Sequence, residues 1–314
     1  MKRDTMPEKI IIDTDPGQDD AVAILLALAT GNRLQLQGIT AVAGNVPVAQ
    51  TSANVLRICE LARRGDMAVY SGAPAPLVFS LETAEFVCGI DGLAGSGLPP
   101  PKGRVAAQHA VDYLISHLLA SDEHSVTLCP LGPLTNIALA LRLRPDIASR
   151  VKRIVLMGGA MNLGNITPAA EFNFYVDPHA AAIVCTSDIP LVMLGLHLTH
   201  QAIATHAQVA EFETMGTATG RAVHGMLTRL RPGGLGTAGH PMHDACVIAF
   251  LLWPELFTGR DCFVDIDMSD GPVRGRSTID WNGRLNKPAN ALVPNTVDAT
   301  TLFDRMIAEF ATLP

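Results

Sequence analysis

Residues 10–29 read IIIDTDPGQDDAVAILLALA, and this stretch decides the fold of the chain. Ile10–Ile12 is a short apolar run typical of a buried strand, and Asp19–Ala29 has the length and composition of a buried helix. Open α/β sheets bind their ligands at the carboxyl ends of strands, where the next helix begins. The stretch therefore predicts a strand–loop–helix unit with a ligand site in its loop.

Four carboxylates lie in this loop within eight residues: Asp13, Asp15, Asp19 and Asp20. A single aspartate would be enough to cap the helix and to interact favourably with its dipole. Four like charges this close repel one another, so something must compensate them. We therefore favour a bound cation over a capping role alone. Because no Cys or His stands beside the aspartates, the donors are all oxygen, and such a set favours Ca²⁺ or Mg²⁺ over zinc.

Other ion- and nucleotide-binding motifs do not fit the loop. In an EF-hand counted from Asp13, the sixth residue would be glycine and the twelfth glutamate, whereas here Gly17 is fifth and Ile24 is twelfth. The loop contains neither the GxxxxGK pattern of a P-loop nor the GxGxxG pattern of a dinucleotide site.

Outward from the loop, short apolar runs alternate with helical patterns as far as residue 194. The predicted strands are 10–12, 34–40, 67–70, 126–129, 154–157 and 191–194, and the predicted helices are 19–29, 48–63, 105–120, 134–143 and 177–185. This alternation is typical of parallel strands joined by crossover helices. The predicted fold class is α/β, with an open, mainly parallel but mixed Rossmann-like sheet and helices on both faces.

The C-terminal third has a different pattern. It contains a helical stretch at 207–230, a Gly-rich loop at 231–241, a helix at 244–253 and a hairpin formed by 262–268 and 276–280. Because no Ser/Gly/Pro-rich linker interrupts the chain, we expect a single domain over residues 1–314. Its loop insertions fall around 71–104 and 207–243, and long loops in a compact domain are usually functional.

Composition excludes several classes of function. The 314 residues carry a net charge of −7 and only 5% aromatic residues, which argues against nucleic-acid and anionic-membrane binding. The six cysteines are scattered without a CxxC pair, so neither a zinc site nor a disulfide scaffold is expected. The longest apolar runs, Ala21–Ala29 and Ala245–Trp253, are too short for a membrane span, and Met1–Lys9 does not resemble a signal peptide. We expect a cytoplasmic protein.

The opening loop also matches a known pattern position by position. A strand, Asp-Thr-Asp-Pro-Gly, one variable residue, Asp-Asp and an apolar helix closely resemble the start of the nucleoside hydrolase family. The further segments that resemble this family are AGNV (43–46), LGPLTN (131–136), MGG (157–159), Asn165, AEFN (170–173), DP (177–178), HDA (243–245) and KPAN (287–290). The resemblance covers nearly the whole chain. It implies the nucleoside hydrolase fold and the hydrolysis of purine or pyrimidine ribonucleosides to base and ribose, for nucleoside salvage.

The resemblance implies a Ca²⁺ cofactor with named ligands. Asp15, Asp20, Asp244 and the backbone carbonyl of Leu131 would hold the ion. Ca²⁺ is a weak acidifier of water, so a carboxylate base is needed beside it, and Asp15 takes that part on the bound water. Asp13 would fix the loop from outside the ligand set.

The resemblance also implies a grip on the ribose. Asp19, Asn165, Glu171 and Asn173 would hydrogen bond its hydroxyls, and such acceptors suit a positive charge developing on the sugar. Glu171 and Asn173 are two residues apart, so in an extended segment both side chains would point to the same side. For the two asparagines the alternative is ordinary turn chemistry.

Three further residues receive roles. His243 would stand at the mouth of the site, as a hydroxyl contact or as the acid that protonates the leaving base, and we count it as catalytic. Met157 would pack beneath the ribose, with an ordinary core position as the alternative. Asn45 would orient the carboxylates of the loop, with a plain turn residue as the alternative.

Two departures from the family pattern fall on the nucleobase side. Cys88-Gly89 stands where relatives often have His-Gly, and residues 225–240 lack the Tyr found in many members. Arg229, Arg231 and His240 are the polar candidates left there. The base preference and the leaving-group acid therefore stay open.

Two other functions compete with nucleoside hydrolysis. A phosphohydrolase with an Asp nucleophile would begin Asp-x-Asp-x-Thr/Val, and Gly17 departs from that pattern. A non-catalytic nucleoside- or sugar-binding module on the same fold is supported only by the altered Cys88 region. For partners, we expect a small ribonucleoside and, from the resemblance, a homodimer or homotetramer, with no nucleic acid and no membrane.

Overall fold

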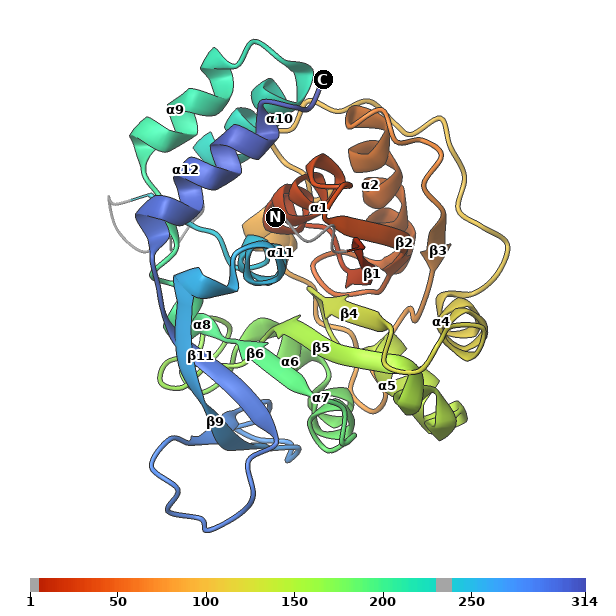
Figure 1. Ribbon diagram of the computed structural model, residues 1–314, viewed down its shortest axis with the longest axis vertical. Coiled ribbons are helices and arrows are strands. Elements are labelled where there is room, and N and C mark those ends of the chain that lie inside the picture. Colours follow the sequence, from red (N-terminus) through yellow and green to blue (C-terminus); the bar gives the residue numbers. More distant parts are fainter. Residues whose placement is uncertain (1–5, 230–238) are drawn as a thin grey trace.

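The computed structural model describes residues 6–229 and 239–314, and a nine-stranded sheet runs through them (Figure 1). The strand order is β10-β9-β11-β6-β5-β4-β1-β2-β3. The strands are β1 (Glu8–Thr14), β2 (Leu34–Ala41), β3 (Val69–Ser71), β4 (Val126–Pro130), β5 (Val151–Met157), β6 (Leu191–Leu194), β9 (Phe257–Ile266), β10 (Ser277–Asp280) and β11 (Ala291–Val297). A separate antiparallel pair joins β7 (Ile203–Ala204) to β8 (His240–Pro241).

Strands β3-β2-β1-β4-β5-β6 are all parallel, as the alternating pattern predicts. The chain moves outward from β1 through β2 to β3 and then returns to place β4 on the other side of β1. Such a reversal leaves a crevice at the carboxyl ends of the two central strands. The aspartate-rich loop after β1 and Leu131 after β4 therefore lie together, because Asp13 pairs with Pro130 in the sheet.

Helices cover both faces of the sheet. They are α1 (Gln18–Ala29), α2 (Val48–Leu61), α3 (Glu85–Cys88), α4 (Ala110–Leu119), α5 (Thr135–Leu143), α6 (Phe172–Val176), α7 (Pro178–Cys185), α8 (Leu196–Thr199), α9 (His206–Thr214), α10 (Ala218–Thr228), α11 (Ala245–Leu252) and α12 (Ala299–Phe310). One core contains residues of α1, α2, α11 and α12, and the other contains residues of α4, α5 and α7, on the opposite face (Figure 1). From Ala21 onward every residue of α1 is apolar. Helices α2, α11 and α12 pack against α1, as a helix that is apolar on all sides requires.

The predicted C-terminal hairpin is confirmed, since β9 and β10 pair antiparallel. The sequence did not predict β11, which lies parallel to β6 and antiparallel to β9, so the sheet becomes mixed at β9. A proline within a strand pattern argues against a central strand. Pro294 is tolerated in β11 because the register with β9 shifts there, between Pro294 and Thr296. Helix α12 was also missed.

Two predicted helices have different bounds. The stretch 207–230 is two helices within the described residues, because Gly216 has a φ of +69° and Thr217 caps α10. The helix predicted from residue 105 begins only at Ala110, where the His109 ring accepts the Val111 N–H. The segment 71–104 is largely loop, as predicted, but it contains α3. In the described ranges, no helix combines the length and the apolarity that crossing a bilayer requires.

Candidate active site

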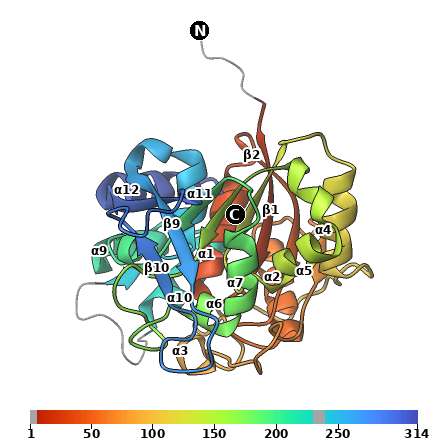
Figure 2. The same ribbon diagram turned by 90° about the horizontal axis from the view of Figure 1, so that it is seen from below.

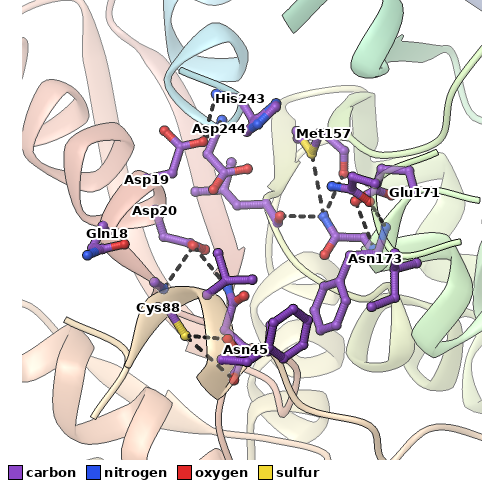
Figure 3. Close-up of a pocket in the computed structure, with 18 residues that line it drawn as sticks. Gln18, Asp19, Asp20, Asn45, Cys88, Met157, Glu171, Asn173, His243 and Asp244 are labelled. Carbon is purple, nitrogen blue, oxygen red and sulfur yellow. Dashed lines mark hydrogen bonds between the residues drawn. The ribbon is translucent and has the colours of Figure 1, made fainter. Parts of the chain in front are cut away.

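A cavity lies at the crevice between β1 and β4 (Figure 3). Asp19, Asp20 and Asp244 line one side of it, and Glu171 and Asn173 line the other. The predicted site residues that line the cavity are Asp19, Asp20, Asn45, Leu131, Met157, Asn165, Glu171, Asn173, His243 and Asp244. Of the predicted set, only Asp15 does not line it. Predicted residues as far apart in sequence as Asp19 and Asp244, 225 positions, thus line one cavity.

Asp15 is packed into the loops that follow β1, β2 and β4. Its Oδ2 accepts the N–H of Asn45 at 2.7 Å, and its Oδ1 is buried without a hydrogen-bond partner. A Cβ added to Gly44 or Gly132 would come within 2.1 Å or 2.3 Å of the Asp15 carboxylate oxygens. Glycine is therefore required at both positions for the backbone to close around this carboxylate.

Asp20 is held at the start of α1. Its carboxylate accepts the hydroxyl of Thr14 at 2.6 Å and the N–H of Gly17 at 3.0 Å. The second contact is the helix-capping contact that the sequence offered as an alternative, so Asp20 caps the helix and also lines the cavity. Asp13 takes the fixing role expected of it, since it accepts Asn136 Nδ2 at 2.8 Å and the Thr40 hydroxyl away from the cavity.

The carboxyl groups perturb one another. Burial, followed by repulsion from Asp20, raises the pKa of Asp15 well above its usual value. Burial and then the charges of Asp20, Asp19 and Asp15 do the same to the pKa of Asp244. Burial also raises the pKa of Asp13 to about 7. Each shift says that a negative charge at this place is unfavourable unless a positive charge compensates it.

The donor set fits a hard cation in its chemistry. Besides burial, repulsion from the Asp20 carboxylate raises the pKa of Asp244, and a bound cation would offset this repulsion. The unpaired Oδ1 of Asp15 is a further oxygen donor. Among residues 6–229 and 239–314, no three Asp, Glu, His or Cys side chains already form a metal centre. The fit of this site to a hard cation therefore rests on two observations. Oδ1 of Asp15 has no hydrogen-bond partner, and all the donors are oxygen atoms.

The opposite side of the cavity corrects one prediction. Glu171 and Asn173 do not lie in an extended segment, because Glu171 is the N-cap of α6 and Asn173 is inside that helix. Glu171 accepts the N–H groups of Asn173, Phe174 and Gly159, so backbone donors already surround its carboxylate. Because these donors do not fully offset its burial, the pKa of Glu171 is raised to about 7.

Asn173 links this side to the central strands. Its Nδ2 donates to the Leu131 carbonyl at 2.8 Å and to the Met157 carbonyl at 3.1 Å (Figure 3). A carbonyl oxygen has two lone pairs, so Leu131 can accept this bond and still face another partner. Asn165 accepts the Phe172 N–H at 2.9 Å, seven residues later, so its side chain ties the loop to the start of α6 while it also lines the cavity.

Asn45 does what the sequence predicts for a residue that orients the loop. Its side-chain Nδ2 donates to the backbone carbonyl of Asp15 at 3.1 Å, in addition to the backbone contact with the Asp15 carboxylate. The backbone N–H and the side-chain amide of Asn45 thus both donate to Asp15. These contacts support an ordering role for Asn45, which also lines the cavity.

His243 stands at the cavity in a defined orientation. Its Nδ1 is 2.7 Å from the hydroxyl of Thr199, which is fully buried. Its backbone N–H and that of Asp244 both point to Asp19 Oδ2, at 2.6 Å and 3.0 Å. The ring of His200 meets the His243 ring edge-on. The predicted late His-Asp pair is thus joined to the aspartate loop.

An apolar part of the lining was not predicted. Phe86 and Val87 come from α3, and Ile166 and Phe172 come from the segment before and at the start of α6. Phe172 lies within the quoted AEFN motif, which could have identified it. Cys88 closes the group from the end of α3, and its Sγ lies 3.2 Å from the Ala84 carbonyl. Of the polar candidates for this side, Arg231 lies outside the described residues, and neither Arg229 nor His240 lines the cavity.

Comparisons with known proteins agree on one family. The model of the inosine-uridine preferring nucleoside hydrolase family matches residues 10–304. A pyrimidine-specific ribonucleoside hydrolase, RihB of Escherichia coli, is 41% identical over 294 residues, covering 93% of each chain. An uncharacterised protein of Schizosaccharomyces pombe is 43% identical over 310 residues, covering 98% of this chain and all of that one.

Solved structures show the same relationship. A purine-preferring ribonucleoside hydrolase from Gardnerella vaginalis has a TM-score of 0.89 at 29% identity, covering 97% of this chain and 98% of its own. The plant nucleoside hydrolase PpNRh1 has a TM-score of 0.89 at 31% identity, covering 98% and 100%. The predicted fold class is confirmed. By its sequence, its fold and the residues gathered at its cavity, this chain belongs to the inosine-uridine preferring nucleoside hydrolase family and is an N-glycosyl hydrolase.

Proposed function

We propose that this protein hydrolyses ribonucleosides to a free base and ribose, with Ca²⁺ as its cofactor. The observation that carries the proposal is the arrangement across the cavity. Asp20 and Asp244, with Asp15 packed beside them, face Glu171 and Asn173. A sugar between these two sides would meet oxygen acceptors from both, which suits a ribosyl group that becomes positive as the bond to its base breaks.

Asp15, Asp20, Asp244 and the Leu131 carbonyl are the proposed ligands of the cation. When bound, Ca²⁺ would orient a water and the vicinal ribose hydroxyls and would offset the charge of these carboxylates. The raised pKa values of Asp15 and Asp244 support this assignment, because no Lys or Arg of residues 6–229 and 239–314 lines the cavity.

The chain's own residues would carry out the proton transfers. Asp15 would take a proton from the attacking water on its unpaired Oδ1. The water oxygen forms the new bond to C1′ as the bond from C1′ to the base nitrogen breaks. The base leaves with the electron pair of that bond and needs a proton, and His243 stands at the cavity to supply one or to contact a hydroxyl.

Asp19 and Asn173 are the proposed contacts to ribose hydroxyls, and Met157 would pack beneath the sugar. Asp19 already accepts the two N–H groups of His243 and Asp244, so it would also keep that pair in place. The apolar side chains of Phe86, Val87, Ile166 and Phe172 would contact the base. Pyrimidine ribonucleosides are the first substrates to test, because the 41% identical relative carries a pyrimidine-specific name.

A reducing-sugar assay tests the proposal. The purified protein is incubated with uridine, cytidine, inosine, adenosine and guanosine, with Ca²⁺ present and after its removal by a chelator. We expect ribose release from at least one of them only with the metal, and none from 2′-deoxyuridine, which lacks one of the vicinal hydroxyls. Binding of all five nucleosides without release of sugar would identify a non-catalytic module instead.

The last part of the proposal concerns the domain organisation, the cellular location and the oligomeric state. We propose one catalytic domain over residues 1–314, acting in the cytoplasm as a homodimer or homotetramer. Light scattering of the purified protein tests the oligomeric state, and fractionation of cells tests the location.

A further inference from the structure

Arg274, in the turn between β9 and β10, is buried between two aromatic rings. Its side chain is only 8% exposed. The guanidinium carbon lies 4.0 Å from the centre of the Phe79 ring and 4.2 Å from that of the Tyr175 ring. Phe79 belongs to the long loop before α3, and Tyr175 belongs to α6. This arginine therefore joins three segments that are far apart in the sequence, and Figure 2 shows the blue segment between β9 and β10 passing beside α6.

Hydrogen bonds also stabilise this contact between the β9–β10 turn, α6 and the loop before α3, here called the junction. Arg274 Nε donates to the Tyr175 carbonyl at 3.0 Å, and Nη1 donates to Glu82 at 3.1 Å. The Tyr175 hydroxyl donates to the same Glu82 carboxylate at 3.1 Å. Gly275 has a φ of +74°, and an added Cβ would come within 2.5 Å of the Tyr175 backbone. The turn between β9 and β10 therefore packs directly against α6.

The junction lies beside the cavity but not in it. Three residues after Glu82 the chain enters α3, whose Phe86, Val87 and Cys88 form one wall of the cavity, here called the α3 wall. Helix α6 supplies Asn173 on the other side, and Glu171 is the N-cap of that helix. A small apolar cluster of Ala84, Phe172 and Val176 fills the space between the two segments.

We propose that Arg274 is a positioning residue that holds the α3 wall against α6 and thereby sets the shape of the base side of the cavity. The inference rests on the proposed function, because it assigns the α3 wall to the nucleobase. It places a determinant of substrate binding in the C-terminal hairpin, which is remote from the aspartate loop.

The chemistry of the junction requires arginine. Glu82 is half exposed, so its ion pair with Arg274 contributes only a small part of the stability of this junction. A planar guanidinium can stack between two rings and donate in its own plane to a carbonyl and a carboxylate at the same time. A lysine would keep the charge and part of the stacking but could not make this set of contacts.

Kinetics of matched variants test the proposal. Arg274→Met removes the contacts and keeps an apolar stem, and Arg274→Lys keeps the charge. Arg260→Met is the control, because Arg260 also stacks on a ring, that of Trp281 at 4.2 Å, but it is exposed and Trp281 lies outside both α6 and the segment before α3. For each variant we measure kcat and KM for the best nucleoside, the inhibition constant of free ribose, and the hydrogen exchange of residues 77–88.

We expect Arg274→Met to raise KM by on the order of tenfold, while ribose inhibition stays unchanged, because ribose lacks the part that meets the α3 wall. Arg274→Lys should recover part of the loss, and only the Arg274 variants should speed exchange in residues 77–88. Equal weakening of nucleoside and ribose would overturn the proposal, since it would report a general loss of structure. An unchanged KM would overturn it as well.

If Arg274→Met does not fold, Glu82→Gln gives the same reading more mildly. It removes the charge that faces Arg274 and the Tyr175 hydroxyl but leaves the ring stacking. A small rise in KM with unchanged ribose inhibition supports the proposal, and no rise contradicts it. The failure of the proposed function is distinguishable, because the unmodified protein would then release no sugar from any nucleoside.

Discussion

The Asp19 carboxylate accepts the backbone N–H of His243 at 2.6 Å, across 224 positions of sequence. The same oxygen accepts the N–H of Asp244 at 3.0 Å. One side chain at the start of α1 therefore fixes the backbone that presents both the proposed acid and a proposed metal ligand. The sequence assigned Asp19 to a ribose hydroxyl, and this second task gives it a role even when no sugar is bound.

Asp19→Asn tests that relationship. An amide keeps one acceptor but loses the charge that strengthens both contacts, so we expect a loss of about 1–3 kcal/mol in the free energy of unfolding. We also expect a fall in kcat/KM of at least about tenfold, because His243 and Asp244 lose their common anchor. Urea unfolding and steady-state kinetics measure the two effects.

Asp298→Asn is the matched control for that variant. Asp298 accepts the Thr301 N–H at the start of α12, so it is also a carboxylate at a helix start, but it does not line the cavity. It should lower stability slightly and leave kcat/KM unchanged. If the two variants lost activity to the same extent, the special role of Asp19 would be refuted.

The second prediction concerns the proposed base. Asp15→Asn should lower kcat by about 10²–10⁴, the usual range for a lost general base. In chelator its stability should not fall, because the amide removes an unfavourable buried charge. Asp13→Asn is the control two residues earlier, since Asp13 is equally buried but lies outside the proposed ligand set and accepts hydrogen bonds from Thr40 and Asn136. Near-normal turnover by Asp15→Asn would end the mechanism.

How far the sequence predicts the site can be judged from these residues. Asp13, Asp15, Asp19 and Asp20 were predictable because they are neighbours in sequence and because strand–loop–helix units place such loops at a sheet crevice. The geometry of Glu171 and Asn173 was not, because α6 is a helix of five residues and too short for a periodic signal.

The base side was the least predictable part. Arg274 has no motif around it, and its contacts to Phe79, Glu82 and Tyr175 depend on how the C-terminal hairpin packs on α6. Strand β11, which attaches that hairpin to β6, carries a proline in its interior, and this hid it from pattern reasoning. Contacts that form only through tertiary packing cannot be predicted from a local sequence pattern.

The third prediction is that calcium stabilises the protein. Ligand that binds only the folded state at a concentration of 100 Kd adds about 2.7 kcal/mol to the free energy of unfolding. The melting temperature should therefore rise with added Ca²⁺ and fall with a chelator, and Asp244→Asn should weaken the shift because it removes a proposed ligand. A melting temperature that does not respond to either treatment would contradict the metal assignment, whatever the activity.

The fourth prediction follows from the raised pKa of Glu171, which burial brings from 4.5 to about 7. The folded state holds this proton more tightly than the unfolded state, so its contribution is complete below about pH 4.5 and is lost as the pH rises through 7. The shift corresponds to about 3 kcal/mol.

Urea unfolding in chelator between pH 4.5 and 8 measures this contribution. Glu171→Gln should flatten the profile, although it should also be less stable at low pH, since its amide N–H group would face the N–H of Gly159 and Phe174 or that of Asn173. A variant whose profile falls as steeply as that of the parent protein would assign the pH dependence to other groups.

The last prediction concerns the hydroxyl that holds His243. Thr199→Val keeps the shape of a fully buried side chain but removes its hydrogen bond to Nδ1. The ring would then be free to turn, and since a misplaced catalytic group costs rate more than binding, we expect kcat to fall by on the order of tenfold with little change in KM.

Thr219→Val is a close control, because Thr219 is also fully buried in a helix and its hydroxyl has no hydrogen-bond partner. That variant should be as active as the parent protein and at least as stable. Equal effects of the two substitutions would mean that Thr199 serves packing alone, whereas a fall confined to Thr199→Val would show that the orientation of His243 matters for turnover.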